Sequence, residues 1–184
     1  LNLTPWLEHV DYRLTMSDYQ HVELEGAELG TRFSNDAWQQ RLQLTHTEIG
    51  NWHGSLGLQS SNEEFGAVGE ESFIPVTDIA SRGLFLVEDY HGTNYTLEFG
   101  ARVNIDDYNP DNGIAPDRDF STFSASASLL LDLYSSASLG ITWSHSERAP
   151  SVEELYSNFG LIDADACVIH FATGACETGD VNLL

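Results

Sequence analysis

The chain has 184 residues and is strongly acidic, with 29 Asp and Glu residues against 7 Lys and Arg residues and a formal net charge of −22. A nucleic-acid partner is therefore excluded in practice, because binding to a phosphate backbone requires a footprint of basic side chains. Aromatic residues make up 11% of the chain, which is too many for a disordered segment. The sequence contains no apolar run of about 18 residues, so we expect no transmembrane helix.

Apolar and polar residues alternate along several long stretches, as they do in β-strands with one apolar and one wet face. The clearest stretches are Tyr95–Asp106, Phe123–Leu133 and Ala137–Ser144. Strands in soluble proteins average about five or six residues, whereas alternating strands of about ten residues are typical of outer-membrane barrels. We therefore expect an all-β fold, an antiparallel transmembrane β-barrel, with a soluble antiparallel sandwich as the alternative.

The alternating stretches predict about eight strands in four hairpins. The hairpins are Trp6–Met16 with Tyr19–Gly26, Trp38–Ile49 with Trp52–Ser61, Ala80–Asp89 with Tyr95–Asp107, and Phe120–Tyr134 with Ala137–His145. Their short turns are expected near Ser17–Asp18, Gly50–Asn51, Tyr90–Asn94 and Ser135–Ser136. Longer acidic links are expected at Ala27–Ala37, Asn62–Asp78, Tyr108–Asp119 and after Ser146. Short turns at one end and long loops at the other are typical of outer-membrane barrels.

Tryptophan and tyrosine residues gather near the predicted strand ends. They include Trp6, Trp38, Trp52, Trp143, Tyr12, Tyr19, Tyr90, Tyr95 and Tyr134. Such a distribution suits aromatic girdles at the two membrane interfaces, although ordinary core packing is an equally good interpretation.

Two motifs lie in the last third of the sequence. The first comprises Glu147–Pro150, Glu154–Tyr156 and Asn158, and the second comprises His170, Ala172–Gly174, Glu177, Gly179–Asp180 and Leu183. Together they resemble two segments of the TonB-dependent outer-membrane receptors. An external loop and a strand of the same family resemble Phe65–Glu71, Phe73–Pro75 and Leu97–Arg102.

This resemblance implies a receptor in the outer membrane of a Gram-negative bacterium, which binds a scarce nutrient and imports it with energy supplied through TonB. Such receptors close a barrel of about 22 strands around a plug. Residues 1–184 would be part of that barrel domain, with the plug, the TonB-contacting N-terminal region and the other strands lying outside them. The implied partners are TonB, outer-membrane lipid and a small cargo.

No enzymatic motif accompanies the resemblance. The sequence lacks a G-x-S-x-G elbow, a P-loop and a dinucleotide-binding fingerprint, so we expect neither catalytic residues nor a cofactor. A passive porin and a barrel enzyme of the phospholipase or protease type are the alternatives, and the two motifs favour the receptor over both.

The acidic charge suggests a cation as cargo, because a focused negative field raises the local concentration of cations. Keeping the loops solvated is the alternative role of the same charge. His170 lies between Asp163, Asp165 and Glu177, and imidazole with carboxylates suits zinc or a similar divalent ion. We therefore expect a metal ion or a metal complex as cargo, such as zinc or a ferric siderophore. The histidine could instead serve only for packing or hydrogen bonding.

Cys167 and Cys176 fall in the link predicted after Ser146. If this link is an external loop, its surroundings are oxidising, and a disulfide is favoured over two free thiols. The disulfide would add about 2–3 kcal/mol of stability by restricting the unfolded chain. The spacing of the two cysteines is not one that zinc sites commonly use.

Overall fold

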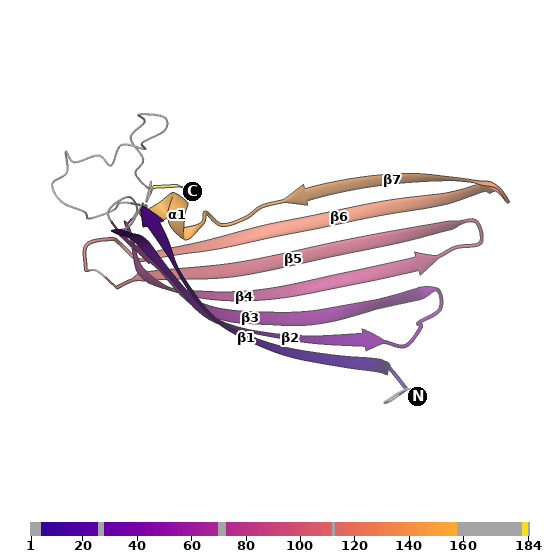
Figure 1. Ribbon diagram of the computed structural model, residues 1–184. Coiled ribbons are helices and arrows are strands. Elements are labelled where there is room, and N and C mark those ends of the chain that lie inside the picture. The colour runs from indigo at the N-terminus through magenta and orange to yellow at the C-terminus, as the bar shows by residue number, and fades with distance from the viewer. Residues whose placement is uncertain (1–4, 26–27, 70–72, 112, 158–181, 184) are drawn as a thin grey trace.

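The computed structural model describes residues 5–25, 28–69, 73–111, 113–157 and 182–183. They form one antiparallel sheet of seven strands, each hydrogen-bonded to the next along the chain (Figure 1). The strands are β1 (Leu7–Glu25), β2 (Glu28–His46), β3 (Trp52–Val68), β4 (Phe73–His91), β5 (Tyr95–Pro110), β6 (Arg118–Tyr134) and β7 (Ala137–Ser146), followed by one short helix, α1 (Val152–Tyr156). The antiparallel all-β fold class is thereby confirmed. In the described part of the chain, no helix has the length and apolarity needed to cross a membrane.

Strand β1 differs from the prediction because it runs without a break for 19 residues. The expected turn near Ser17–Asp18 is wrong, since Ser17 pairs with Ala37 and Asp18 pairs with Asp36 on β2. Two predicted strands are therefore one, and the described residues form seven strands rather than eight. Serine and aspartate favour turns, but an extended backbone suits them when a neighbouring strand supplies the hydrogen bonds.

The strands also continue into segments predicted as links. Strand β2 begins at Glu28, β3 reaches Val68 and β4 begins at Phe73, so most of Ala27–Ala37 and Asn62–Asp78 is paired strand rather than loop. Of the link predicted at Tyr108–Asp119, only residues 111–117 connect two strands. Apolar alternation ends where both faces of a strand meet water, whereas the backbone ladder continues beyond that point. The links were therefore predicted too long.

Three of the predicted turns are confirmed, and all lie at one end of the sheet. Gly50 adopts a left-handed φ of 67° in the turn that an Ile49–Trp52 bridge closes, a conformation that glycine adopts without steric cost. The other two turns follow β4 and β6. We call this end the turn end, and the opposite end, with connections 26–27, 69–72 and 111–117, the loop end (Figure 1).

The register divides the side chains into two faces, because directly paired residues point to the same side of a sheet. One paired row, on what we call the outer face, is Tyr12, Leu42, Leu58, Leu84, Val103 and Phe123. The adjacent row on the inner face is Arg13, Arg41, Gln59, Gly83, Asn104 and Thr122. Leu58 is 55% exposed, as expected of a side chain that faces lipid instead of a protein core.

Aromatic rings cluster on the outer face at the turn end. The Trp52 and Tyr90 ring centroids lie 5.1 Å apart, and those of Tyr90 and Tyr95 lie 5.9 Å apart. This placement agrees with a girdle at the membrane interface. Tyr19 does not fit the same pattern, because it lies on the inner face, where its ring packs against His21.

Candidate functional site

Helix α1 forms from the first sequence motif and lies at the loop end of the sheet (Figure 1). The Ser151 hydroxyl accepts a hydrogen bond of 3.2 Å from the Glu154 backbone N–H, and the Glu154 carboxylate accepts one of 2.7 Å from the Ser151 backbone N–H. This is a capping box, which satisfies two backbone donors at the start of the helix. Arg148 donates two further hydrogen bonds of 2.7 Å to the same carboxylate. The charged residues of the motif therefore hold α1 together.

The apolar residues of the motif dock α1 against the inner face. Leu155 and Tyr156 are completely buried. They belong to a cluster with Ala67, Ile74, Tyr108, Ala115 and Val152. The Tyr108 hydroxyl donates to the Pro150 carbonyl over 2.8 Å, and the Tyr156 hydroxyl donates to the Pro116 carbonyl over 3.0 Å. The connection between β5 and β6, the segment before α1 and the helix itself are thus joined into one packed unit.

Ionisable groups in this unit have shifted pKa values. The hydrogen bonds from Arg148, followed by the one from the Ser151 backbone, lower the pKa of Glu154 to about 2. Glu154 in turn raises the pKa of Arg148. Burial raises the pKa of Tyr156 to about 12. Glu154 is therefore ionised and Tyr156 neutral throughout the physiological pH range.

A cavity of about 270 Å³ lies between α1 and the inner face. Its lining includes Asn35, Glu63, Phe65, Ile79, Tyr108, Ser151, Val152 and Glu153. The Glu63 carboxylate accepts a hydrogen bond of 2.6 Å from the Asn35 amide, which orients it. Glu63 and Glu153 therefore bring two carboxylates to one small cavity whose other walls are largely apolar.

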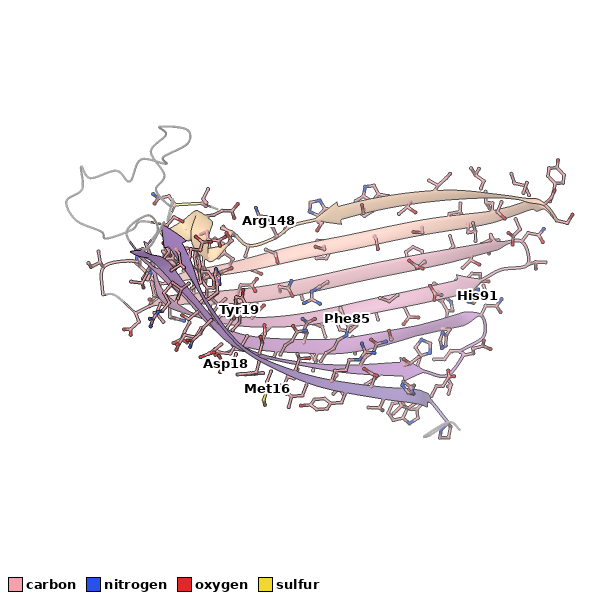
Figure 2. The ribbon with its side chains drawn as sticks, viewed as in Figure 1. Met16, Asp18, Tyr19, Phe85, His91 and Arg148 are labelled. Carbon is pink, nitrogen blue, oxygen red and sulfur yellow. The ribbon has the colours of Figure 1, made fainter. Side chains whose placement is uncertain are left out.

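Farther toward the turn end, the inner face carries two arginines around a second hollow of about 340 Å³. The Arg41 guanidinium carbon lies 4.1 Å from the centre of the Phe85 ring, in cation–π geometry; Figure 2 shows Phe85 near the middle of the sheet. Arg102 donates to Gln59 over 3.1 Å and to Asn104 over 2.9 Å. Both cations are held in place by these contacts.

The residues predicted to bind metal, His170, Asp163, Asp165 and Glu177, lie outside the described residues. The predicted Cys167–Cys176 disulfide also lies outside them. Within the described ranges, no three or more His, Cys, Asp or Glu side chains gather as a metal site would require.

Sequence reasoning did not find the cavity beneath α1. Glu63, Tyr108 and Glu153 come from three distant parts of the chain and meet only through the register of β3, β4 and β5 and the docking of α1. The available signal was the motif itself, whose buried leucine and tyrosine require an apolar surface to pack against.

Residues 6–183 match the protein family described as TonB dependent receptor-like, beta-barrel. The chain belongs to this family. TonB-dependent receptors are transport proteins of the Gram-negative outer membrane, not enzymes; they interact with TonB and carry small cargoes. In an outer-membrane barrel the apolar face meets lipid and the polar face meets the lumen, while short turns face the periplasm. The unit built on α1 is then at the external mouth of the lumen.

Proposed function

We propose that this TonB-dependent receptor barrel imports a metal ion or a metal complex. The observation that carries the proposal is the cavity between α1 and the inner face, which Glu63 and Glu153 both line. Carboxylate oxygens attract and ligate metal cations, and the net charge of −22 strengthens the attraction over longer distances. The cargo would contact this cavity first and then the inner face, moving toward the turn end.

The two arginines of the inner face distinguish between a bare metal ion and an anionic metal complex as the cargo. A bare cation is attracted to the cavity but repelled by Arg41 and Arg102, whereas an anionic metal complex can contact these guanidinium groups. Zinc would therefore bind mainly at the loop end. A ferric siderophore with exposed carboxylates would also use the arginines farther inside.

We further propose that His170, Asp163, Asp165 and Glu177 supply additional metal ligands. Three or four ligands are usual for a zinc site, and Glu63 with Glu153 would provide only two. TonB would supply energy through the N-terminal region that other receptors of the family use.

The test is isothermal titration calorimetry on the whole receptor that contains this chain, with zinc and a ferric siderophore as separate probes. We expect Glu63→Gln and His170→Ala each to weaken binding of the accepted probe by about tenfold or more, since each removes one charge-assisted contact or ligand. Glu64→Gln is the matched control, because Glu64 is adjacent to Glu63 on β3 but lies on the outer face, away from the cavity. Failure of both probes to bind, or binding indifferent to both variants, would overturn the metal assignment.

The disulfide proposed between Cys167 and Cys176 has a separate test. Alkylation of the unfolded, unreduced receptor should modify neither cysteine, and prior reduction should allow both to be modified. Mass spectrometry of the labelled protein measures the outcome. Labelling of both cysteines without reduction would show that the thiols are free.

A further inference from the structure

A hollow of about 500 Å³ lies on the outer face, on the opposite side of the sheet from the proposed cargo path. Its floor is apolar and is formed by Leu42, Leu58, Leu84, Val103 and Ile105. The volume falls within the range of about 300–1,000 Å³ that is usual for small-molecule pockets. Because an outward-facing surface of a transmembrane barrel meets lipid, an apolar hollow there is suited to an acyl chain.

Three polar residues of the hollow lie together on its loop-end side. Gln40, Ser60 and Arg82 are paired neighbours on β2, β3 and β4, in the row two residues closer to the loop end than the leucines. The hollow therefore has an apolar part and a polar edge, like the two parts of a lipid molecule. A lipid that lay in the hollow in this direction would have its headgroup toward the loop end, in the leaflet at that side of the membrane.

Arg82 makes the polar edge selective for an anion. Its side chain is 70% exposed, and its Nη1 atom lies 4.0 Å from an Asp107 carboxylate oxygen, the outer limit of an ion pair. A guanidinium has five N–H donors in a planar fork that matches a phosphate, so the Asp107 contact leaves donors for a second anion. The Ser60 hydroxyl and the Gln40 amide are donors beside it, and the Gln40 carbonyl already accepts from Tyr12 over 3.3 Å.

Beyond the hollow, toward the loop end, the outer face carries acidic side chains. A paired row on the outer face consists of Asp18, Asp36, Glu64 and Asp78, and Figure 2 labels Asp18 next to Met16 on β1. Asp78 is four residues from Arg82, or about 13 Å along the strand. That distance exceeds the Debye length of about 8 Å at physiological ionic strength, so the row repels an anion at Arg82 only weakly. It does prevent the headgroup from moving farther along the strands.

We propose that this outer hollow binds a phosphorylated lipid of net negative charge from the loop-end leaflet, with an acyl chain against the leucines and the phosphate on Arg82. The proposal rests on the chain spanning the membrane as its family does and is independent of the cargo. A lipid bound at this place would contact all five strands from β1 through β5 and hold them at the height of the outer-leaflet headgroups. The lipid is therefore expected to be bound more tightly than the surrounding bilayer lipid.

The experiment measures lipids retained by the whole receptor after delipidation in a neutral maltoside detergent. Phosphatidylglycerol and phosphatidylcholine with identical acyl chains are added back, and native mass spectrometry compares how much of each is bound. We expect a preference for phosphatidylglycerol that falls by about tenfold in Arg82→Gln, the loss of one charge-assisted contact. Arg13→Gln is the matched control, because Arg13 is 74% exposed and also pairs with an aspartate, but lies on the inner face.

A second variant tests the apolar part of the site. Leu58→Trp fills the hollow and is expected to lower retention of both lipids, while circular dichroism should show an unchanged strand content. The proposal is overturned if Arg82→Gln leaves the lipid preference unchanged, or if Arg13→Gln lowers it equally. Unchanged retention in Leu58→Trp would also overturn it, because the acyl chain would then not occupy the hollow. Calorimetry of metal binding is a separate readout, so failure here leaves the cargo proposal unaffected.

Discussion

Among single residues, Glu154 has the clearest role, because it links Arg148 to the start of α1. Its pKa is about 2 in the folded protein and near the ordinary value of 4.5 when unfolded. A lowered folded-state pKa contributes stability above the unfolded pKa, and this contribution is lost as the pH falls from 4.5 toward 2. We therefore predict that α1 loosens over this acidic window.

Pepsin digestion at Leu155–Tyr156 can measure that loosening, with Glu154→Gln digested beside the native receptor at each pH. The native protein should be cut more slowly than the variant near pH 4.5, and the difference should shrink as the pH falls toward 2, where protonation of Glu154 removes its charge from a growing fraction of the molecules. A constant difference across the window would contradict the assigned role of the carboxylate.

Gly57 is a second residue whose importance depends on a single contact. A Cβ atom at this position would overlap the Phe85 ring, over which the Arg41 guanidinium lies. We predict that Gly57→Val displaces the ring and costs about 1–3 kcal/mol of stability, as overpacking usually does. Urea unfolding in lipid vesicles measures the cost. Gly140→Val is the control, since the nearest atom to a Cβ there is 4.0 Å away; equal losses in both variants would make the ring contact irrelevant.

At the scale of the element, α1 is too short to be stable alone, because isolated helices need about 12–15 residues. Its stability must come from the buried cluster around Leu155. We predict that Leu155→Ala costs about 2–5 kcal/mol of docking free energy and undocks the helix without unfolding the barrel. Hydrogen exchange of residues 152–156 should accelerate strongly, whereas the strands should be unaffected. Glu153→Ala should change little, because the Glu153 side chain is exposed and does not belong to the buried cluster; an equal effect would mean that burial of Leu155 does not hold the helix.

Within each strand, neighbouring residues point to opposite faces of the sheet. Leu86 lies on the outer face and Val87 on the inner face of β4. We predict that Leu86→Arg costs about 2–4 kcal/mol, because it places a charge in the lipid near the bilayer midplane. Val87→Arg should cost much less in the same vesicle unfolding assay, since its side chain points into the polar lumen. Equal costs would contradict the assignment of the two faces.

At the scale of the whole molecule, the described sheet is open at both sides. Strand β1 pairs only with β2, and β7 pairs only with β6, among the residues that the structure describes. A bilayer cannot satisfy the hydrogen-bonding groups of an open edge, so a barrel must close. We therefore expect both edges to pair with further strands of the receptor, and the inner-face arginines and the cavity beneath α1 to line its lumen.

Much of this architecture could be predicted from local patterns. The alternation at Tyr95–Asp106 places Leu97 and Val103 on one face and Arg102 on the other, as the register confirms. The turn at Gly50–Asn51 was predictable because glycine suits its left-handed backbone. The break expected at Ser17–Asp18 was not, because the backbone ladder with Ala37 and Asp36 outweighs the turn preference of those residues.

The sequence by itself determined the fold class, the two faces of the sheet and the family, because each depends on the order of residue types along the chain. Only the tertiary structure decided which distant residues meet. Glu63 and Glu153 line one cavity because α1 docks there, and Arg82 lies at the edge of the leucine hollow because of the register of neighbouring strands. The physical reason is that register and docking are set by the packing of whole elements, and a shift of two residues would preserve every alternating pattern while separating those side chains.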